Sequence, residues 1–262
     1  MYLNVNDAQV YAYTGARALS GDQPTLVFVH GAASDHSVWA WQSRYFAHHG
    51  FNVLAVDLPQ HGRSGGCALA SVEAIADWLV AMLDAADVES AALVGHSLGS
   101  LAALEAAARN GPRVERIALL GPAVPMTVSD ELQDAARRDE PLAFELINGW
   151  SFSATRQRGG NAVPGMWMTG NAMRLLERTP SGVLATDLAA CHAYDRGLAA
   201  AAAVRCRVLA IIGARDLMAP PRSAQALIAA LHDAEVVELR ESGHALMAEE
   251  PAAVLDALRK FL

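Results

Sequence analysis

The sequence has no cluster of lysine and arginine residues, and its net charge is −8. Nucleic acids and acidic membrane surfaces bind basic patches, so both are poor candidate partners. The amino terminus lacks a basic segment followed by an apolar one, and no apolar run reaches membrane-spanning length without charge or glycine. We therefore expect a cytoplasmic monomer or homodimer that binds a small, neutral molecule and no membrane.

Cysteine is also scarce, and the sequence lacks the patterns that bind metals and phosphates. Three cysteines, Cys67, Cys191 and Cys206, stand at unpatterned spacings, which argues against a disulfide framework and a zinc site, so we expect buried thiols. The histidines lack ligand spacing with cysteines or carboxylates. No glycine-rich loop carries the Lys-Ser/Thr of a phosphate-binding loop. We expect neither a metal nor another cofactor.

What the sequence has is an alternation of apolar runs and helical patterns along 262 residues, 53% of them hydrophobic. Each run is apolar on both faces, which is typical of strands covered by helices on both sides. The runs are 25–29, 51–56, 90–95, 116–120, 207–212 and 235–239. Helices are expected over 72–86, with Ser71 as N-cap, over 98–110, and from Pro251 onward. This order predicts an α/β fold with a mostly parallel, doubly wound sheet.

Two segments depart from this alternation. Residues 3–13 show a strand pair with a turn at Asn6-Asp7, which we expect at one edge of the sheet. Residues 122–205 have helical patterns, no clear strand, and many tryptophans and methionines. They would form either an ordinary helical layer or a cap over the carboxyl ends of the strands, where open α/β sheets bind ligands.

The cap interpretation divides the chain into a core, residues 1–121 and 206–262, and an inserted cap, residues 122–205. Three apolar side chains of the cap are our candidates for substrate binding. They are Trp150, Trp167 and Met168.

The segment "VGHSLGS" at 94–100 contains the pattern G-x-S-x-G between a predicted strand and a predicted helix. Such a turn strains the backbone of Ser97 and exposes its hydroxyl at the edge of the sheet. Gly95 and Gly99 leave room for the helix to pass close to neighbouring strands. The Leu98 N–H, at the start of that helix, is a candidate oxyanion donor. We predict that Ser97 is a nucleophile.

A nucleophilic serine needs a base and a carboxylate to orient it. Among nine histidines, His244 follows the last predicted strand and precedes the last helix, at the same sheet edge as Ser97. Asp216 follows the run 207–212 at that edge, and we expect it to orient His244. The competing acids are Asp57, Asp187, Asp195 and Glu241.

The remaining histidines have structural interpretations, such as a hydrogen bond that shapes a loop at His30, except that His36 could also line a pocket. A second oxyanion donor is expected in the small-residue loop after the run 25–29. Its backbone N–H would come from Ala32 or, as a weaker alternative, from Ala33.

Five blocks, "VHGAASDHSVW", "DLPQHGRS", "GHSLGS", "IIGARDLMAP" and "SGHALMAEEP", resemble the signature blocks of the α/β-hydrolase superfamily in order. The resemblance implies an eight-stranded, mostly parallel sheet with a cap after the sixth strand. The order Ser97, Asp216, His244 is also that of the superfamily. Two departures, Gln60 and Ser100 in place of frequent glycines, do not touch the predicted triad.

The expected activity is acyl transfer to water, as in a carboxylesterase acting on small or medium, largely apolar esters. The resemblance implies that an epoxide hydrolase or a dehalogenase would carry an aspartate at the position of Ser97. The serine there argues against both. A lactonase, a thioesterase, a haloperoxidase, a hydroxynitrile lyase or a carbon–carbon bond hydrolase would share the triad and stays open. A non-catalytic receptor for a small ligand is the alternative from another class.

Overall fold

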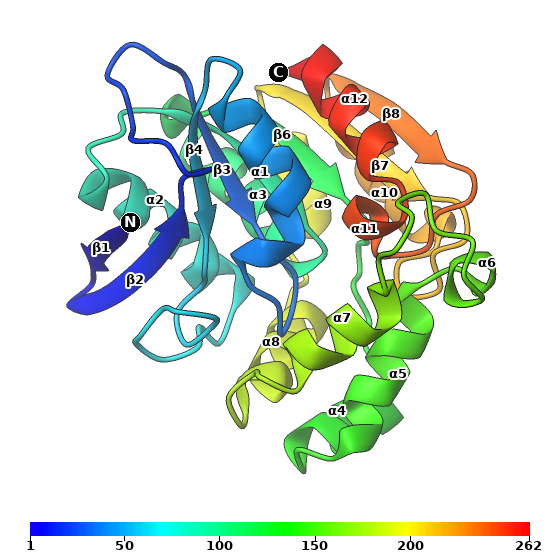
Figure 1. Cartoon of the computed structure of the whole chain (residues 1–262). Helices are drawn as coiled ribbons and strands as arrows, with labels where there is room; N and C mark the ends of the chain where they lie inside the picture. Colours follow the sequence, from blue (N-terminus) through cyan, green and yellow to red (C-terminus); the bar gives the residue numbers. More distant parts are fainter.

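All six apolar runs are strands of one sheet in the computed structural model, which describes residues 1–262 (Figure 1). The eight strands lie in the order β1-β2-β4-β3-β5-β6-β7-β8. From β3 to β8 all neighbours are parallel, whereas β1 and β2 pair antiparallel. The strands are β1 (Tyr2–Val5), β2 (Ala8–Tyr13), β3 (Thr25–Val29), β4 (Asn52–Val56), β5 (Ala91–His96), β6 (Val114–Leu120), β7 (Arg207–Gly213) and β8 (Ala234–Leu239). The predicted fold class is confirmed.

The hairpin at the amino terminus forms one edge of this sheet, as predicted. Asn6 and Asp7 have φ values of 49° and 62°, the left-handed backbone that a tight two-residue hairpin turn requires. Asparagine and aspartate tolerate this conformation better than other residues with side chains. The local sequence therefore sets the register of β1 against β2.

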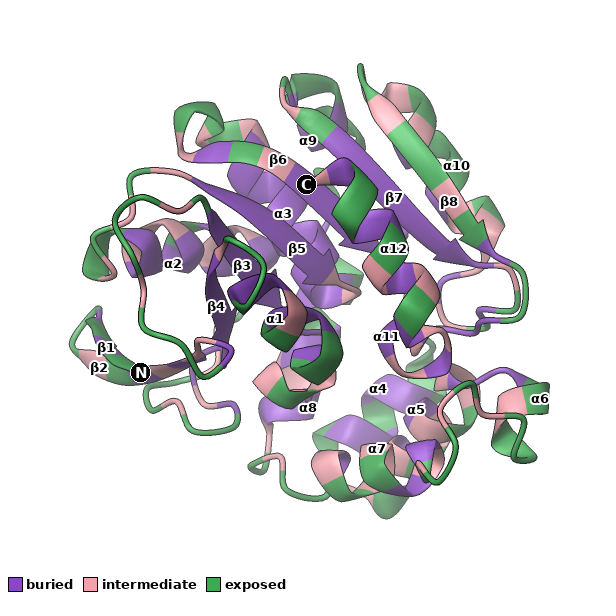
Figure 2. Cartoon of the chain, turned by 45° about the horizontal axis from the view of Figure 1, so that its top comes forward, coloured by how far each residue is buried: buried purple, intermediate pink, exposed green.

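Helices cover both faces of the sheet (Figure 2). Alternate residues of a strand face opposite sides, so in β3 Val27 and Val29 join the core under α2 and α3, while Phe28 joins the core under α1 and α12. The helices are α1 (Ala40–Ala47), α2 (Val72–Ala85), α3 (Leu98–Arg109), α4 (Asp130–Arg137), α5 (Pro141–Ser151), α6 (Ala154–Gln157), α7 (Met168–Leu176), α8 (Val183–Ala193), α9 (Gly197–Ala203), α10 (Pro221–Ala230), α11 (Leu246–Glu249) and α12 (Pro251–Phe261), with 3₁₀ turns η1 (His36–Trp39) and η2 (Gly111–Arg113).

The segment between β6 and β7 contains helices and no strand, in agreement with the sequence. Figure 1 shows α4, α5, α7 and α8 together beyond one end of the sheet. The last helix of this segment, α9, differs from the others because it packs against α3 and α10. It therefore packs with helices that cover the sheet, and we call the segment from α4 to α8 the helical insertion.

Two further expectations are wrong. The run 235–239 was expected to be buried on both faces, but β8 is the outer strand of the sheet, and its Val236 is 48% exposed. The three cysteines are free, as expected, but only Cys191 is buried, whereas Cys67 is exposed and Cys206 is half-buried. None of the helices has the length and apolar sequence needed to cross a bilayer.

The close approach of α3 to β3 generates a stability prediction. A Cβ atom added at Gly99 would lie 2.4 Å from the Val29 carbonyl oxygen and 2.6 Å from that of His30. Because both contacts are with backbone, Gly99→Ala should lower the free energy of unfolding by about 1–3 kcal/mol or more. At Gly149, on the exposed side of α5, a Cβ would meet nothing within 4 Å.

Gly149→Ala is thus the matched control, and it should stabilise the protein by about 0.5–1 kcal/mol because it favours the helix. Urea denaturation of both variants measures the two effects. Equal stabilities would contradict the close approach.

Candidate active site

The turn between β5 and α3 holds Ser97 in a strained conformation, as the sequence predicts. Its φ and ψ are 53° and −118°, a region that residues with side chains rarely adopt. The neighbouring glycines make this possible, since a Cβ at Gly95 would lie 2.1 Å from the Gly99 carbonyl oxygen. Ser97 N–H also donates to Leu120 O at 2.9 Å, which ties the turn to the end of β6.

His244 and Asp216 form a buried pair at the same edge of the sheet. His244 Nδ1 lies 2.7 Å from Asp216 Oδ2. The other oxygen, Oδ1, accepts the backbone N–H groups of Met218 and Ala219 at 2.8 and 2.7 Å. Burial alone would raise the pKa of Asp216, but His244 and these hydrogen bonds outweigh it and lower that pKa. An ionised Asp216 keeps the proton of His244 on Nδ1, which leaves Nε2 as an acceptor.

Ser97 and His244 line one cavity, so the structure brings the predicted nucleophile and base together. The side chains of Ser97 and His244 form no hydrogen bond with each other in this structure. Catalytic hydrogen bonds are often long before substrate binds.

The backbone of His244 is fixed from two sides. His96 Nε2 donates to the His244 carbonyl at 2.9 Å. Burial and the nearby His244 lower the pKa of His96 to about 3, so it stays neutral at assay pH. On the other side, Glu249 accepts the Gly243 N–H at 2.8 Å and the Ser153 N–H at 2.9 Å. Sequence analysis missed Glu249, because nothing in the sequence shows that it bends back to its own loop.

The two predicted oxyanion donors differ in how they are placed. Leu98 is the first residue of α3, and the first N–H groups of a helix have no acceptor within it. Ala32 lines the cavity. The alternative donor, Ala33, already gives its N–H to Asp187 Oδ2 at 2.9 Å. The geometry therefore favours Ala32 over Ala33.

The cavity has a volume of about 890 Å³, within the range of small-molecule sites. Hydrophobic residues make up 23 of the 36 that line it, and they come from both the sheet and the helical insertion. Of the three apolar candidates, Trp150 and Met168 line the cavity and Trp167 does not.

Trp167 lies outside the cavity, so its role in substrate binding stays a prediction without support from the lining. Its ring lies against Gly170 at the start of α7, and its side chain is 69% exposed. Sequence analysis also missed Trp41 and Leu217, which line the cavity although they are 50% and 66% exposed. They lie outside the predicted cap, and only the folded chain shows that they border the same space.

The four acids that compete with Asp216 as partner of His244 are either exposed or bound to other residues. Asp195 and Glu241 are exposed, and Glu241 pairs with Arg215 at 2.7 Å. Asp57 binds its own loops, as expected: Oδ1 accepts the backbone N–H of His36 at 2.7 Å, and Oδ2 accepts that of Arg63 at 2.8 Å. Asp187 forms a buried pair with His61 at 2.9 Å.

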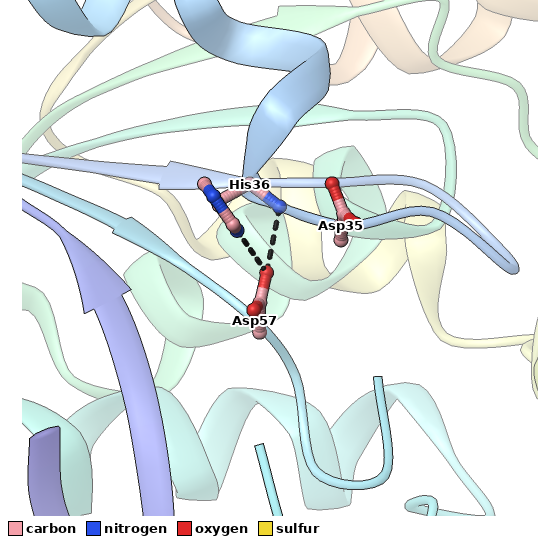
Figure 3. A group of neighbouring side chains, drawn as sticks. All are labelled: Asp35, His36 and Asp57. Atoms are coloured by element: carbon pink, nitrogen blue, oxygen red, sulfur yellow. Dashed lines mark hydrogen bonds and ion pairs between the residues drawn. The ribbon is translucent and has the colours of Figure 1, made fainter. Parts of the chain in front are cut away.

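Asp35, His36 and Asp57 form a cluster whose potential ligand atoms lie within 4.8 Å of one another. Figure 3 shows both the ring and the backbone nitrogen of His36 directed at Asp57. The oxygens of Asp35 accept from Ser37 N–H at 2.8 Å and from Arg178 at 3.2 Å. Each carboxylate oxygen of Asp35 and Asp57 already accepts a hydrogen bond. These residues therefore fit a role in holding the loops together and do not fit a metal site.

A serine on a strand-to-helix turn thus lines the same cavity as a histidine that is paired with an aspartate, at one edge of a parallel sheet, and this arrangement is typical of α/β hydrolases. The chain belongs to the alpha/beta hydrolase fold family, which residues 24–251 match.

Relatives of known sequence and structure extend over most of the chain. An uncharacterised protein of Mycobacterium tuberculosis is 27% identical over 97% of this chain and 79% of its own length. A pimeloyl-(acyl-carrier protein) methyl ester esterase of Chromobacterium violaceum is 30% identical over 86% of this chain and 89% of its own. The enol-lactonase of Burkholderia xenovorans LB400 superposes with a TM-score of 0.87 at 24% identity, covering 100% of this chain and 99% of that one. At this identity, the structural likeness shows the fold alone.

His30 generates a prediction about pH and stability. It is fully buried, its Nδ1 donates to Gly31 O at 2.8 Å, and its Nε2 accepts the Leu58 N–H at 3.1 Å. Burial lowers its pKa from 6.5 to about 4. Between these values the unfolded chain binds the proton at His30 and the folded chain does not, so the contribution of His30 to stability is constant above pH 6.5 and falls as pH drops toward 4. The slope from His30 is about 1.4 kcal/mol per pH unit, and His96 adds to it.

Urea denaturation between pH 7 and pH 4.5 measures this slope. His30→Gln should reduce it by about 1.4 kcal/mol per pH unit, whatever its effect on stability at pH 7. His48→Gln, at an exposed histidine, is the control and should leave the slope unchanged. An unaltered slope in His30→Gln would show that His30 is not buried in its neutral form.

Proposed function

We propose that the protein is a carboxylesterase that cleaves small or medium, largely apolar carboxylic esters through an acyl-enzyme intermediate. The observation that carries the proposal is the His244–Asp216 pair on the wall of the cavity that Ser97 also lines. A serine hydroxyl is a weak nucleophile unless a base accepts its proton. Because Asp216 holds Nδ1, Nε2 of His244 is available for this.

In the acylation step, the Ser97 oxygen attacks the ester carbonyl carbon while His244 Nε2 takes the hydroxyl proton. The N–H groups of Leu98 and Ala32 stabilise the oxyanion of the tetrahedral intermediate. The carbon–oxygen bond to the alcohol then breaks, and the protonated His244 donates its proton to the leaving oxygen. Asp216 stabilises the imidazolium between these two transfers.

Deacylation repeats the route with water. The oxygen of a water molecule attacks the acyl carbon while His244 takes a proton from that water. The same N–H groups stabilise the second tetrahedral intermediate. His244 then returns the proton to the Ser97 oxygen as the acid leaves. The balance is one ester and one water converted into one acid and one alcohol.

The lining of the cavity supports an apolar substrate. Trp150 and Met168 belong to an apolar wall with adaptable shape, because methionine side chains fill irregular spaces. A relative that is 30% identical over most of both chains is named as a methyl ester esterase, which also favours an ester. Lactones, thioesters and carbon–carbon bonds would use the same triad with other leaving groups, so a substrate panel must include all of them.

Replacement of Ser97 tests the proposal. Ser97→Ala should lower kcat on a p-nitrophenyl ester by on the order of 10⁴ to 10⁶ without loss of stability. Ser90→Ala is the control, because Ser90 precedes the same strand at its opposite end and pairs with Glu115 on the surface. A serine-directed phosphonate, located by mass spectrometry, should label Ser97 in the wild type and in Ser90→Ala. Retained turnover in Ser97→Ala, or a label elsewhere, would overturn the proposal.

Replacement of Asp216 tests the assignment of the orienting carboxylate. Asp216→Asn should lower kcat by on the order of 10⁴, because an amide does not hold the imidazole in the required tautomer. Asp195→Asn changes an exposed aspartate near the end of the helical insertion and should keep wild-type activity. Steady-state kinetics with the same ester gives both values. Comparable losses in both variants would remove Asp216 from the triad.

A further inference from the structure

Asp187, in α8 of the helical insertion, forms a buried ion pair with a loop of the sheet. Its Oδ2 lies 2.9 Å from His61 Nε2, and the side chains are 2% exposed each. His61 Nδ1 donates to the Pro59 carbonyl at 3.0 Å. A carbonyl can only accept, so Nδ1 carries a proton. Burial would lower the pKa of His61, but Asp187 and the Pro59 carbonyl raise it above its ordinary value.

The same oxygen of Asp187 also accepts the Ala33 N–H at 2.9 Å. Ala33 has a φ of 51°, in the left-handed region, so its conformation requires support from its surroundings. Thr179, between α7 and α8, donates its hydroxyl to the Ala33 carbonyl at 3.1 Å. Both polar backbone groups of Ala33 are thus bound by residues of the helical insertion.

These bonds act on the peptide next to the one that carries the Ala32 N–H. The Ala33 N–H lies in the peptide plane that joins Ala32 to Ala33, so holding it restricts the rotation of Ala32. A well-packed apolar pair would join two layers at least as strongly as a buried ion pair. The carboxylate oxygen differs from an apolar contact because its hydrogen bonds are directional. It binds Ala33 in the loop after β3 and His61 in the loop after β4.

We propose that Asp187, held by His61, is a positioning residue that directs the Ala32 N–H at the oxyanion. This rests on the proposed function, and it makes the helical insertion part of the catalytic apparatus as well as a wall of the cavity. Asp187 is buried and does not line the cavity. It acts through Ala33, and Thr179 assists from the other side.

Three variants separate positioning from stability. Asp187→Ala removes the acceptor, whereas Asp187→Asn keeps an acceptor oxygen for Ala33. Tyr194→Phe is the matched control, because it removes another buried hydrogen bond between this segment and the sheet layers, from Tyr194 to Glu105 at 2.7 Å. Glu105 lies on α3 and not on the loop after β3 that carries Ala32.

We expect Asp187→Ala to lower kcat by about 10- to 100-fold with little change in KM, since loss of a whole oxyanion donor costs about 10²–10³-fold. Asp187→Asn should recover most of this loss, and Tyr194→Phe should keep wild-type kcat. Two inhibitors give a second readout. An alkyl trifluoromethyl ketone, which forms an oxyanion on Ser97, should bind Asp187→Ala more weakly by the same factor as kcat. The matching methyl ketone should bind unchanged.

Equal losses for both ketones, or a kcat in Asp187→Ala like that of Tyr194→Phe, would overturn the proposal. If Asp187→Ala does not fold, Thr179→Val decides: a several-fold loss in kcat and in trifluoromethyl ketone affinity supports positioning, and wild-type values refute it. Phosphonate labelling of the wild type keeps the two proposals apart. A label at Ser97 with no effect at position 187 refutes only the positioning, whereas a label elsewhere refutes the esterase itself.

Discussion

The strained turn at Ser97 is the constraint on which the rest of the site depends. A φ of 53° at a residue with a side chain persists only where the surroundings enforce it. Here β5 feeds straight into α3, and α3 passes so close to β3 that only glycine fits at position 99. The hydroxyl is thereby fixed at the edge of the sheet, and the loops after β3, β7 and β8 must meet it there.

Around this turn, the histidines His30 and His96 are neutral, whereas the buried carboxylate of Asp216 is ionised. His30 and His96 are kept neutral, because burial lowers the pKa of each far below the pH of an assay. Asp216 keeps its charge through His244 and two backbone N–H groups, although it is buried. Of the three histidines His30, His96 and His244, only His244 has a carboxylate as the partner of a ring nitrogen, whereas His30 and His96 bind backbone groups.

Much of the fold was predictable because strand and helix signals are local. Apolar runs, the N-cap at Ser71 and the turn at Asn6-Asp7 depend on residues close in sequence, and the elements formed as predicted. The triad candidates also followed from order alone, since parallel strands end at one edge. The exposure of Trp167 and the edge position of β8 depend on packing between distant segments. No local pattern encodes such packing, and the sequence placed Asp187 only among the competing acids.

The helical insertion is bound to two of the loops that meet at Ser97, and each time a buried carboxylate makes the connection. Asp187 binds the loop after β3 from within the insertion. Glu249 binds Gly243 in the loop after β8 and reaches Ser153 in the insertion. Hydrogen bonds to charged groups contribute about 1.5–3 kcal/mol each, and a buried carboxylate left without its donors is costly. Displacing the insertion as a unit would therefore disturb both loops, so the shape of the cavity and the geometry of the site are set by the same contacts.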